Sequence, residues 1–283
     1  MRRGTLLWRT IGFISLVSTL LFLCGFGIAL KDIIAPSDRT PFYADNEAES
    51  GSGSGAGASQ VIRVTALGDS LTKGTGDSKG EGYVKQSVKL MEDKYDKPVK
   101  LMNNLAINGL RADQLNDKLT NDKGFRLAVS EADIILMTIG GNDLFQYAQG
   151  QGEEEGDDED VQRSAGRSGE LSLEELQENM TEGVKRLEHT IDLLNEINPK
   201  ARVVYVGLYN PFYDVEDLRD GSIQVQEWNR QVYAVIHRYP NMRLVPTFDL
   251  FEANISRYLS SDHFHPNHEG YSAIAERIVQ SLD

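Results

Sequence analysis

From residue 61 onward, short apolar runs alternate with longer amphipathic stretches. The apolar runs are rich in Val, Ile and Leu and are apolar on both faces, which is typical of strands buried in a parallel sheet. Five such runs cover residues 61–67, 99–106, 133–139, 201–208 and 242–248. Because strands that alternate with helices form a sheet with helices on both faces, the pattern predicts an α/β three-layer α/β/α sandwich with a mainly parallel sheet.

The amphipathic stretches predict the helices of this sandwich. The clearest helix follows the capping-box pattern Ser172-x-x-Glu175 and continues with apolar side chains at helical spacing as far as Leu194. Further helices are expected at residues 81–95, 111–129, 223–238 and 267–282.

Side-chain positions on these helices can be predicted as well. In helix 223–238, we expect Trp228, Tyr233 and Ile236 to lie in the core or to line a cleft. We expect His189 and His237 to lie on the helix surface.

The first thirty residues have a different character. Residues 10–30 carry no charged side chain, and an apolar helix of about 20 residues spans the hydrocarbon core of a bilayer. Arg2, Arg3 and Arg9 precede this stretch, so the positive-inside rule predicts a cytoplasmic N-terminus and export of everything that follows. We therefore expect residues 1–30 to be a transmembrane anchor in the bacterial cell membrane. The alternative is a signal segment whose cleavage leads to secretion of the remainder.

Two further segments have too few apolar residues to build a core. Residues 31–60 include a Gly/Ser/Ala-rich run and are predicted to be a flexible linker. Residues 148–170 contain the run EEEGDDED and are predicted to be an acidic, disordered insertion. The remaining sequence, within 61–283, is predicted to form one domain.

Charge and cysteine content exclude some properties. The chain has a formal net charge of −14, which disfavours nucleic acid as a partner because phosphate backbones repel an acidic protein. Cys24 is the only cysteine in the sequence, so no intrachain disulfide can form.

Polar clusters occur near the ends of the predicted strands and before the last helix. They are residues 68–71, 104–109, 140–143 and 261–266. Since ligands of open α/β sheets bind outside the carboxyl ends of the strands, we expect these clusters to meet at one edge of the sheet.

The residue types in these clusters match the requirements of acyl transfer. Ser70 supplies a hydroxyl nucleophile, which needs a base within hydrogen-bond reach. Asp262 and His265 lie three positions apart, so the carboxylate can hold the imidazole in one tautomer. Gly109 offers a backbone N–H and Asn142 a side-chain amide for the oxyanion that develops on the substrate.

Together these blocks resemble the SGNH/GDSL hydrolase superfamily. They read GDSL (68–71), N-x-A-x-N-G (104–109), GGND (140–143) and DHFHPNHEGY (262–271). The resemblance implies a flavodoxin-like fold with a five-stranded parallel sheet and ester hydrolysis without a metal or organic cofactor. It makes Ser70 the nucleophile, His265 the base and Asp262 the residue that orients the base. The implied oxyanion hole is formed by Ser70, Gly109 and Asn142.

The substrate stays open at the level of the sequence. Members of this superfamily act on lysophospholipids, short acyl esters, thioesters and O-acetylated sugars, so we expect a lipid or an acylated envelope glycan. The segment 209–212 follows a predicted strand at the catalytic edge and is expected to line the acyl pocket.

Two other functions are compatible with the same residues. One is a metal-dependent phosphoesterase, in which the ligands would be Asp69, Asn142, Asp143, His263, His265 and His268. The chain lacks the Asp-x-His and the Gly-Asn-His motifs expected of such a site. The other is an envelope binding module that retains the fold without turnover.

Overall fold

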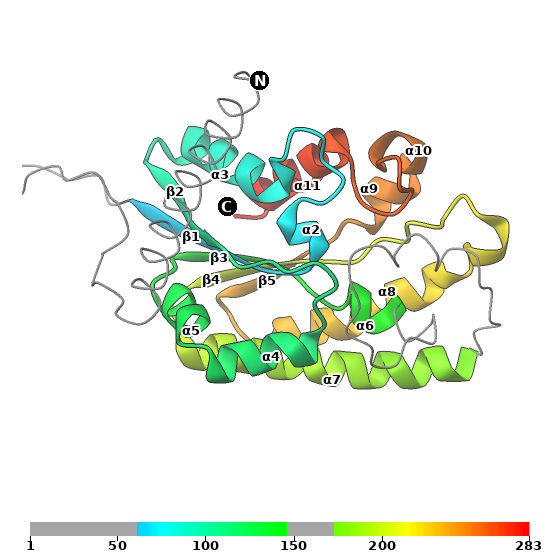
Figure 1. Cartoon of the computed structure of the whole chain (residues 1–283), viewed down its shortest axis with the longest axis horizontal. Coiled ribbons are helices and arrows are strands. Elements are labelled where there is room, and N and C mark those ends of the chain that lie inside the picture. Colours follow the sequence, from blue (N-terminus) through cyan, green and yellow to red (C-terminus); the bar gives the residue numbers. More distant parts are fainter. Residues whose placement is uncertain (1–60, 146–172, 283) are drawn as a thin grey trace, which may run out of the picture. The chain divides into compact units, whose positions relative to one another are not determined.

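The computed structural model describes residues 61–145 and 173–282 (Figure 1). The predicted N-terminal segment 1–30, the linker 31–60 and the acidic insertion 148–170 lie outside these residues. Within the described part of the chain, no helix is both long enough and apolar enough to cross a membrane.

Five strands form one sheet in the order β2-β1-β3-β4-β5, and every neighbouring pair is parallel. The strands are β1 (Ile62–Gly68), β2 (Val99–Asn104), β3 (Ile134–Thr138), β4 (Arg202–Val206) and β5 (Met242–Val245). Each predicted apolar run therefore contains a strand, and the predicted fold class is confirmed. The prediction that every run is apolar on both faces holds for the inner strand β3 but not for β2, an edge strand with exposed positions along its length.

Helices cover both faces of the sheet, as Figure 1 shows. One face carries α3 (Gly82–Tyr95), α9 (Phe248–Glu252), α10 (Ile255–Tyr258) and α11 (His268–Gln280). The opposite face carries α4 (Ala112–Asn121), α5 (Lys123–Ser130), α7 (Leu173–Ile197) and α8 (Gly221–Ile236). The short helices α2 (Ser70–Lys73) and α6 (Gly141–Phe145) follow the carboxyl ends of β1 and β3, and the 3₁₀ turn η3 (Glu216–Leu218) follows β4.

The predicted helix 111–129 is two helices, α4 and α5. Asp122 separates them with an extended backbone, and its carboxylate accepts the N–H groups of Gly124 and Phe125. An aspartate that bonds to the following backbone favours a new N-cap over a continued helix, which explains the interruption. Helix α7 begins directly after Ser172, which itself lies outside the described residues, so its predicted capping box stays a prediction.

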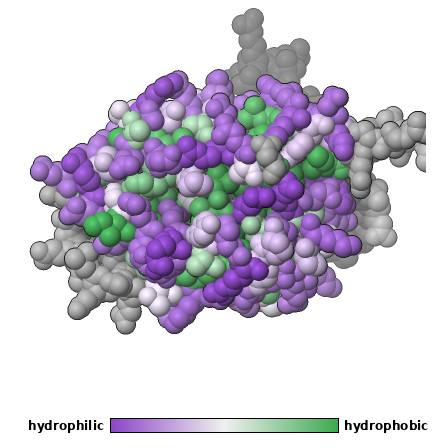
Figure 2. Space-filling view, turned by 180° about the vertical axis from the view of Figure 1, so that it is seen from behind, coloured by the Kyte–Doolittle hydropathy of each residue, from purple (hydrophilic) through white to green (hydrophobic). Residues whose placement is uncertain are grey.

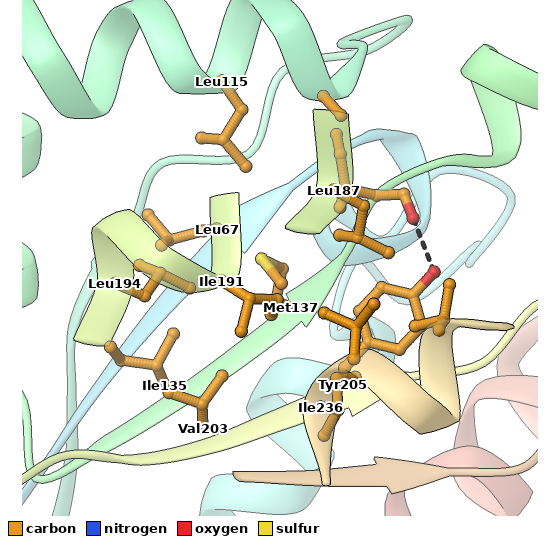
Figure 3. Packing of buried hydrophobic residues seen from close by; sticks show 14 of the residues in the cluster. Leu67, Leu115, Ile135, Met137, Leu187, Ile191, Leu194, Val203, Tyr205 and Ile236 are labelled. Carbon is orange, nitrogen blue, oxygen red and sulfur yellow. Dashed lines mark hydrogen bonds between the residues drawn. The ribbon is translucent and has the colours of Figure 1, made fainter. Parts of the chain in front are cut away.

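The larger part of the core lies between the sheet and the face formed by α4, α7 and α8 (Figure 3). Side chains from these helices meet the strands in a cluster that includes Leu67, Leu115, Ile135, Met137, Leu187, Ile191, Leu194, Val203, Tyr205 and Ile236. The Tyr205 hydroxyl donates to the carbonyl of Ile139 at 2.7 Å and accepts from the Trp228 indole N–H at 3.2 Å. These bonds satisfy the polar atoms that the aromatic side chains bring into the core.

The expectations for helix α8 are confirmed. Trp228 and Ile236 are buried, and Tyr233, which is 53% exposed, lines a pocket together with Asn229 and Leu244. At 3.6 residues per turn, Tyr233 lies about 140° around the helix from Trp228, beyond the buried face. His189 and His237 are both exposed, as predicted. On the face seen from behind, the surface is mostly hydrophilic, with apolar residues in small patches (Figure 2).

Candidate active site

The turn after β1 places Ser70 at the carboxyl edge of the sheet. Gly68 has φ +131°, and a Cβ there would lie 1.8 Å from the carbonyl oxygen of Thr138, so only glycine allows β1 to approach β3 this closely. Asp69 caps the following helix by accepting the N–H of Leu71 at 3.0 Å. Ser70 is the first residue of α2 and is 9% exposed.

Ser70, His265 and Asp262 lie in one continuous line of hydrogen bonds. The Ser70 Oγ lies 2.8 Å from Nε2 of His265, although the two residues are 195 positions apart in the chain. Nδ1 of the same ring lies 2.7 Å from Oδ2 of Asp262. The structure thus brings together the three residues that the sequence selected.

The loop before α11 holds the Asp262 carboxylate in place. Its Oδ1 accepts the Ser260 hydroxyl at 2.7 Å and the backbone N–H groups of Phe264 and His265 at 2.9 Å each. His263 adopts φ +55° in this tight turn. Burial acts to raise the pKa of Asp262, but the hydrogen bonds from His265, Ser260 and the two N–H groups outweigh it and lower the pKa to about 2. Asp262 is therefore a charged acceptor at neutral pH, and Nδ1 of His265 carries a proton that it donates.

A buried network of hydroxyl groups stabilises the turn between β1 and α2. Thr138 Oγ1 donates to Oδ1 of Asp69 at 2.6 Å, and Thr72 Oγ1 lies 2.7 Å from both Thr138 Oγ1 and the Tyr83 hydroxyl. Burial raises the pKa of Asp69, and the hydrogen bonds from Thr138 and Leu71 oppose this shift. The network fixes the direction in which β1 ends and α2 begins.

The candidate oxyanion donors come from the ends of β2 and β3. Asn142 lies in α6, and its side-chain amide donates to the Leu110 carbonyl at 3.0 Å. Gly109, which precedes Leu110, has φ +74° in the turn between β2 and α4. The Asn142 amide is thus fixed against the turn that contains Gly109.

Asp143 connects α6 to the turn between β2 and α4. Its side chain is fully buried, and Oδ2 accepts the N–H of Ala112 at the start of α4, at 2.9 Å. Oδ1 lies 3.8 Å from Nη1 of Arg186 and has no hydrogen-bond partner among the described residues. Burial raises the pKa of Asp143 to about 6.

A small pocket opens beside the Ser70 hydroxyl. Its walls are formed by Asp69, Ser70, Leu71, Gly141, Asn142, Leu208, Tyr209, Pro211 and Phe264. Two members of the predicted segment 209–212, Tyr209 and Pro211, therefore line this pocket, as expected.

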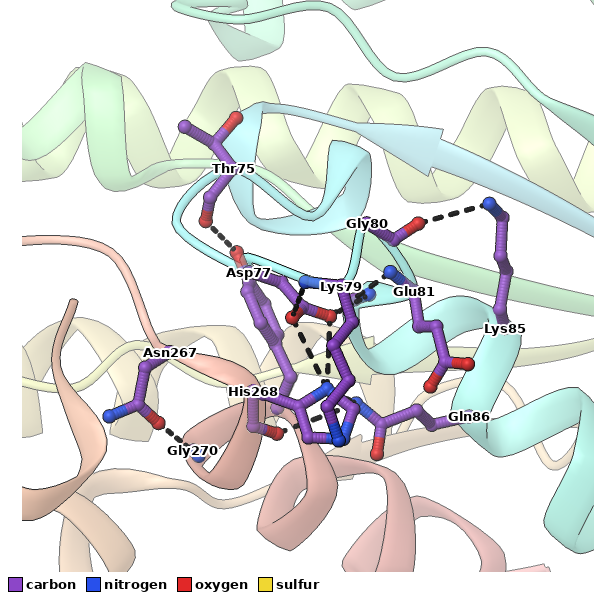
Figure 4. A network of polar contacts seen from close by, with 12 residues as sticks. Thr75, Asp77, Lys79, Gly80, Glu81, Lys85, Gln86, Asn267, His268 and Gly270 are labelled. Atoms are coloured by element: carbon purple, nitrogen blue, oxygen red, sulfur yellow. Dashed lines mark hydrogen bonds and ion pairs between the residues drawn. The ribbon is translucent and has the colours of Figure 1, made fainter.

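The loop between α2 and α3 packs against the loop that carries His265. A Cβ at Gly76 would lie 2.8 Å from Cβ of His265 and 2.7 Å from the Pro266 carbonyl oxygen. The buried Asp77 carboxylate accepts the N–H groups of Lys79, Glu81 and Gly82 and lies 3.2 Å from Nδ1 of His268 in α11 (Figure 4). These contacts join the first helical segment of the fold to its last.

The residues of the rival metal site do not converge. Among the residues that the structure describes, no three His, Cys, Asp or Glu side chains form a group suited to hold a metal ion. Asp69 bonds to Thr138, Asp143 to Ala112, and His268 to Asp77.

Sequence reasoning did not assign roles in ester hydrolysis to Asp77, Asp143 and Phe264. Asp143 lies in the block 140–143, and Phe264 in the block 262–271, so their positions gave a signal. Asp77 gave none, because a lone aspartate in a glycine-rich stretch is typical of an ordinary turn.

A parallel sheet in this order, with Ser70, His265 and Asp262 hydrogen-bonded at its carboxyl edge, defines the class of SGNH hydrolases. The chain belongs to the GDSL-like lipase/acylhydrolase family, whose model matches residues 66–273. It is an ester hydrolase.

The chain is similar to individual proteins over most of its length. The chain is 35% identical over 225 residues to the Bacillus subtilis protein YpmR, an alignment that covers 78% of this chain and 81% of that protein. It is 31% identical over 221 residues to the spore germination lipase LipC of Bacillus licheniformis, which covers 77% of this chain and 95% of LipC. Among solved structures, the lipase Lip_vut3 from a goat rumen metagenome matches with a TM-score of 0.64 and 27% identity. That match covers 78% of this chain and 97% of Lip_vut3.

Proposed function

We propose that this ester hydrolase cleaves carboxylic esters through a Ser70–His265–Asp262 triad and a serine-bound acyl intermediate. The observation that carries the proposal is the continuous hydrogen bonding at 2.8 and 2.7 Å that links the three side chains. A hydroxyl, an imidazole of defined tautomer and a charged carboxylate are the groups that nucleophilic acyl transfer requires.

The reaction begins with proton transfer from Ser70 to His265. Nε2 of His265 accepts the hydroxyl proton while Oγ of Ser70 forms a bond to the carbonyl carbon of the ester. The ring becomes an imidazolium, which the charge of Asp262 stabilises. His265 then gives the proton to the alcohol oxygen as the ester C–O bond breaks, and the acyl group remains on Ser70.

Water completes the cycle. His265 takes a proton from a water molecule, which attacks the acyl-serine, and the proton returns to Oγ of Ser70 as the carboxylic acid leaves. The negative charge that develops on the carbonyl oxygen in both steps needs donors. The proposed donors are the backbone N–H groups of Ser70 and Gly109 and the amide of Asn142. The anchoring of Asn142 on the Leu110 carbonyl supports this role, because it fixes the amide before substrate binds.

The proposed nucleophile is tested by covalent labelling. The full chain should react with a fluorophosphonate probe, and Ser70→Ala should remove both the label and at least about 10³-fold of the esterase activity. A matched control is Ser281→Ala, which changes a serine at the end of α11 and should leave labelling intact. Unchanged esterase activity in Ser70→Ala would place the nucleophile elsewhere.

The competing functions predict other outcomes. A metal-dependent phosphoesterase would lose its activity on chelation, whereas the triad mechanism would not. A binding module without turnover would hydrolyse no ester and would show no difference between the wild type and Ser70→Ala.

We further propose that the substrate is a lipid or an acylated envelope glycan, met by a domain that is exported and held at the bacterial membrane. The support is the uncharged stretch 10–30 behind Arg2, Arg3 and Arg9. If this segment is cleaved, the same domain is secreted.

A further inference from the structure

Thr75, in the loop between α2 and α3, is hydrogen-bonded to three segments of the candidate active site. Its backbone N–H donates to the carbonyl oxygen of Ser70 at 3.0 Å. Its hydroxyl donates at 3.1 Å to Oδ1 of Asn108, the residue before Gly109. Its carbonyl oxygen accepts the hydroxyl of Tyr271 in α11 at 2.7 Å (Figure 4). Thr75 therefore connects the nucleophile, the turn that offers an oxyanion donor and the helix that follows the proposed base.

The backbone around Thr75 has little freedom to move. A Cβ at Gly76 would lie 2.8 Å from Cβ of His265, so the two loops are in close contact at this point. The Tyr271 side chain, which holds the Thr75 carbonyl, is fully buried. The Thr75 hydroxyl thus extends from a fixed backbone to Asn108.

Asn108 and Gly109 are the two central residues of a β-turn. The N–H of Leu110 closes the turn by donating to the carbonyl oxygen of Ile107 at 3.2 Å. Gly109 has φ +74° and Asn108 has no positive φ, which matches a type II turn. The N–H of Gly109, in the peptide group between the two residues, has no acceptor in the described part of the chain. It is therefore available to a substrate.

The Asn108 side chain can compete with the substrate for this N–H. Asparagine side chains readily bond to backbone N–H groups close by in the sequence, and the next N–H after Asn108 is that of Gly109. If Oδ1 accepted this N–H, the donor would be lost to the oxyanion. Within residues 61–145 and 173–282, the Thr75 hydroxyl makes the one hydrogen bond to the Asn108 side chain.

We propose that Thr75 is a positioning residue whose hydroxyl holds Oδ1 of Asn108 away from the Gly109 N–H, so that this N–H stays free for the oxyanion. The inference rests on the proposed function and adds to it a side chain outside the triad and the donors. Because the oxyanion develops fully only in the transition state, the effect should fall on kcat and not on KM.

Steady-state kinetics of the full-length protein on p-nitrophenyl butyrate test the proposal. Thr75→Val keeps the branched shape without the hydroxyl, and its kcat should fall about five- to tenfold at a nearly unchanged KM, the factor by which one neutral hydrogen bond shifts an equilibrium. Thr75→Ser keeps the hydroxyl and should stay within about twofold of the wild type. The matched control is Thr120→Val, which removes a hydroxyl bonded to the Asn116 carbonyl in α4 and should leave kcat unchanged.

A second substitution distinguishes this role from simple support of the loop. Asn108→Ala removes the competing acceptor, so the double variant Thr75→Val/Asn108→Ala should recover the kcat that Thr75→Val loses. The affinity for a boronic acid, which forms a tetrahedral adduct with the nucleophile, should fall in Thr75→Val and recover in the double variant.

Each outcome supports or overturns the proposal. An unchanged kcat in Thr75→Val, or a loss that persists in the double variant, would overturn it and leave the triad intact. If urea unfolding shows that Thr75→Val does not fold, Thr75→Ala replaces it with the same expected pattern. Absence of Ser70-dependent turnover of every ester would overturn the proposed function, and this inference with it.

Discussion

Asp262 and Asp143 are two carboxylates with opposite electrostatic environments. Asp262 receives hydrogen bonds from a ring, a hydroxyl and two backbone N–H groups, and its pKa falls to about 2. Asp143 is buried with one oxygen lacking a hydrogen bond among the described residues, and its pKa rises to about 6. The first is suited to stay charged in the presence of an imidazolium, while the second destabilises the fold whenever it is charged.

Replacing Asp262 with Asn should lower kcat by about 10²- to 10⁴-fold. The amide oxygen of the new side chain would accept the two backbone N–H groups, which turns its NH₂ toward Nδ1 of His265. The ring would then carry its proton on Nε2 and could not accept the proton of Ser70. Steady-state kinetics measure the loss, and Ser260→Ala, which removes only one bond to Asp262, should stay within about tenfold of the wild type. A loss below tenfold in Asp262→Asn would contradict the orienting role.

Asp143 should make the free energy of unfolding depend on pH. Its pKa is raised in the folded state, so the folded protein binds the extra proton between about pH 4 and 6, and stability falls as pH rises through this range. A shift from 3.8 to about 6 corresponds to roughly 3 kcal/mol. Asp143→Asn cannot titrate, so urea unfolding of both proteins at pH 4.5, 6 and 7.5 should show the variant gaining stability relative to wild type as pH rises. A constant difference across these values would refute the shift.

The candidate active site is built where connections leave the carboxyl ends of β1, β2, β3 and β4, together with the loop between α10 and α11 that carries Asp262 and His265. The short helices α2 and α6 and the turn at Gly109 each present a group that the proposed chemistry uses, whereas the long helices serve to cover the sheet. The loop between α2 and α3 supports the site indirectly, because it packs against the loop that carries His265.

Replacing Asp77 with Asn should destabilise the loop between α2 and α3. The Asp77 carboxylate accepts three backbone N–H groups, whereas the NH₂ of an asparagine would face at least one of these N–H groups, donor to donor. The free energy of unfolding should therefore fall by about 1–3 kcal/mol. Because Gly76 contacts the backbone of the loop that carries His265, the esterase activity should fall as well. Chemical denaturation and kinetics measure the two effects, and His268→Gln, which alters one contact of Asp77, should cost less in both. Equal effects of the two variants would show that the backbone bonds contribute little.

The five strands and the main helices were predictable from the sequence, whereas a break within a helix and contacts between distant segments were not. Each strand could be found because burial on a parallel sheet requires an apolar run, and Ser70, Asp262 and His265 could be found because acyl transfer restricts the residue types. The break at Asp122 was missed, because a local cap overrides a periodic pattern. The pocket wall formed by Phe264 and Tyr209 depends on a contact across 55 positions, which a single sequence does not reveal.

The whole chain combines an acidic hydrolase domain with an N-terminal stretch that is apolar and carries only positive charges. The formal net charge is −14, although the first thirty residues contain arginines and no acidic residue. An acidic protein is repelled by anionic headgroups, so attachment to a membrane would depend on the apolar stretch 10–30.

The proposed location can be tested by fractionation of bacteria that express the full chain. We expect the protein to sediment with membranes, to resist extraction by high salt, and to be digested by protease added outside the cytoplasmic membrane. A variant with two arginines introduced within 10–30 should lose this association, since each charge at the bilayer centre costs about 2.5–3.5 kcal/mol. Release of a shortened protein into the medium would identify a cleaved signal instead, and a soluble cytoplasmic wild type would refute export.

The hydrogen bond between Ser70 and His265 joins the connection after the first strand to the segment before the last helix. During synthesis, β1 leaves the ribosome before α11, so Ser70 is made long before its proposed base, His265. Because the proposed mechanism needs both residues, we expect a chain that has not yet acquired α11 to hydrolyse no ester.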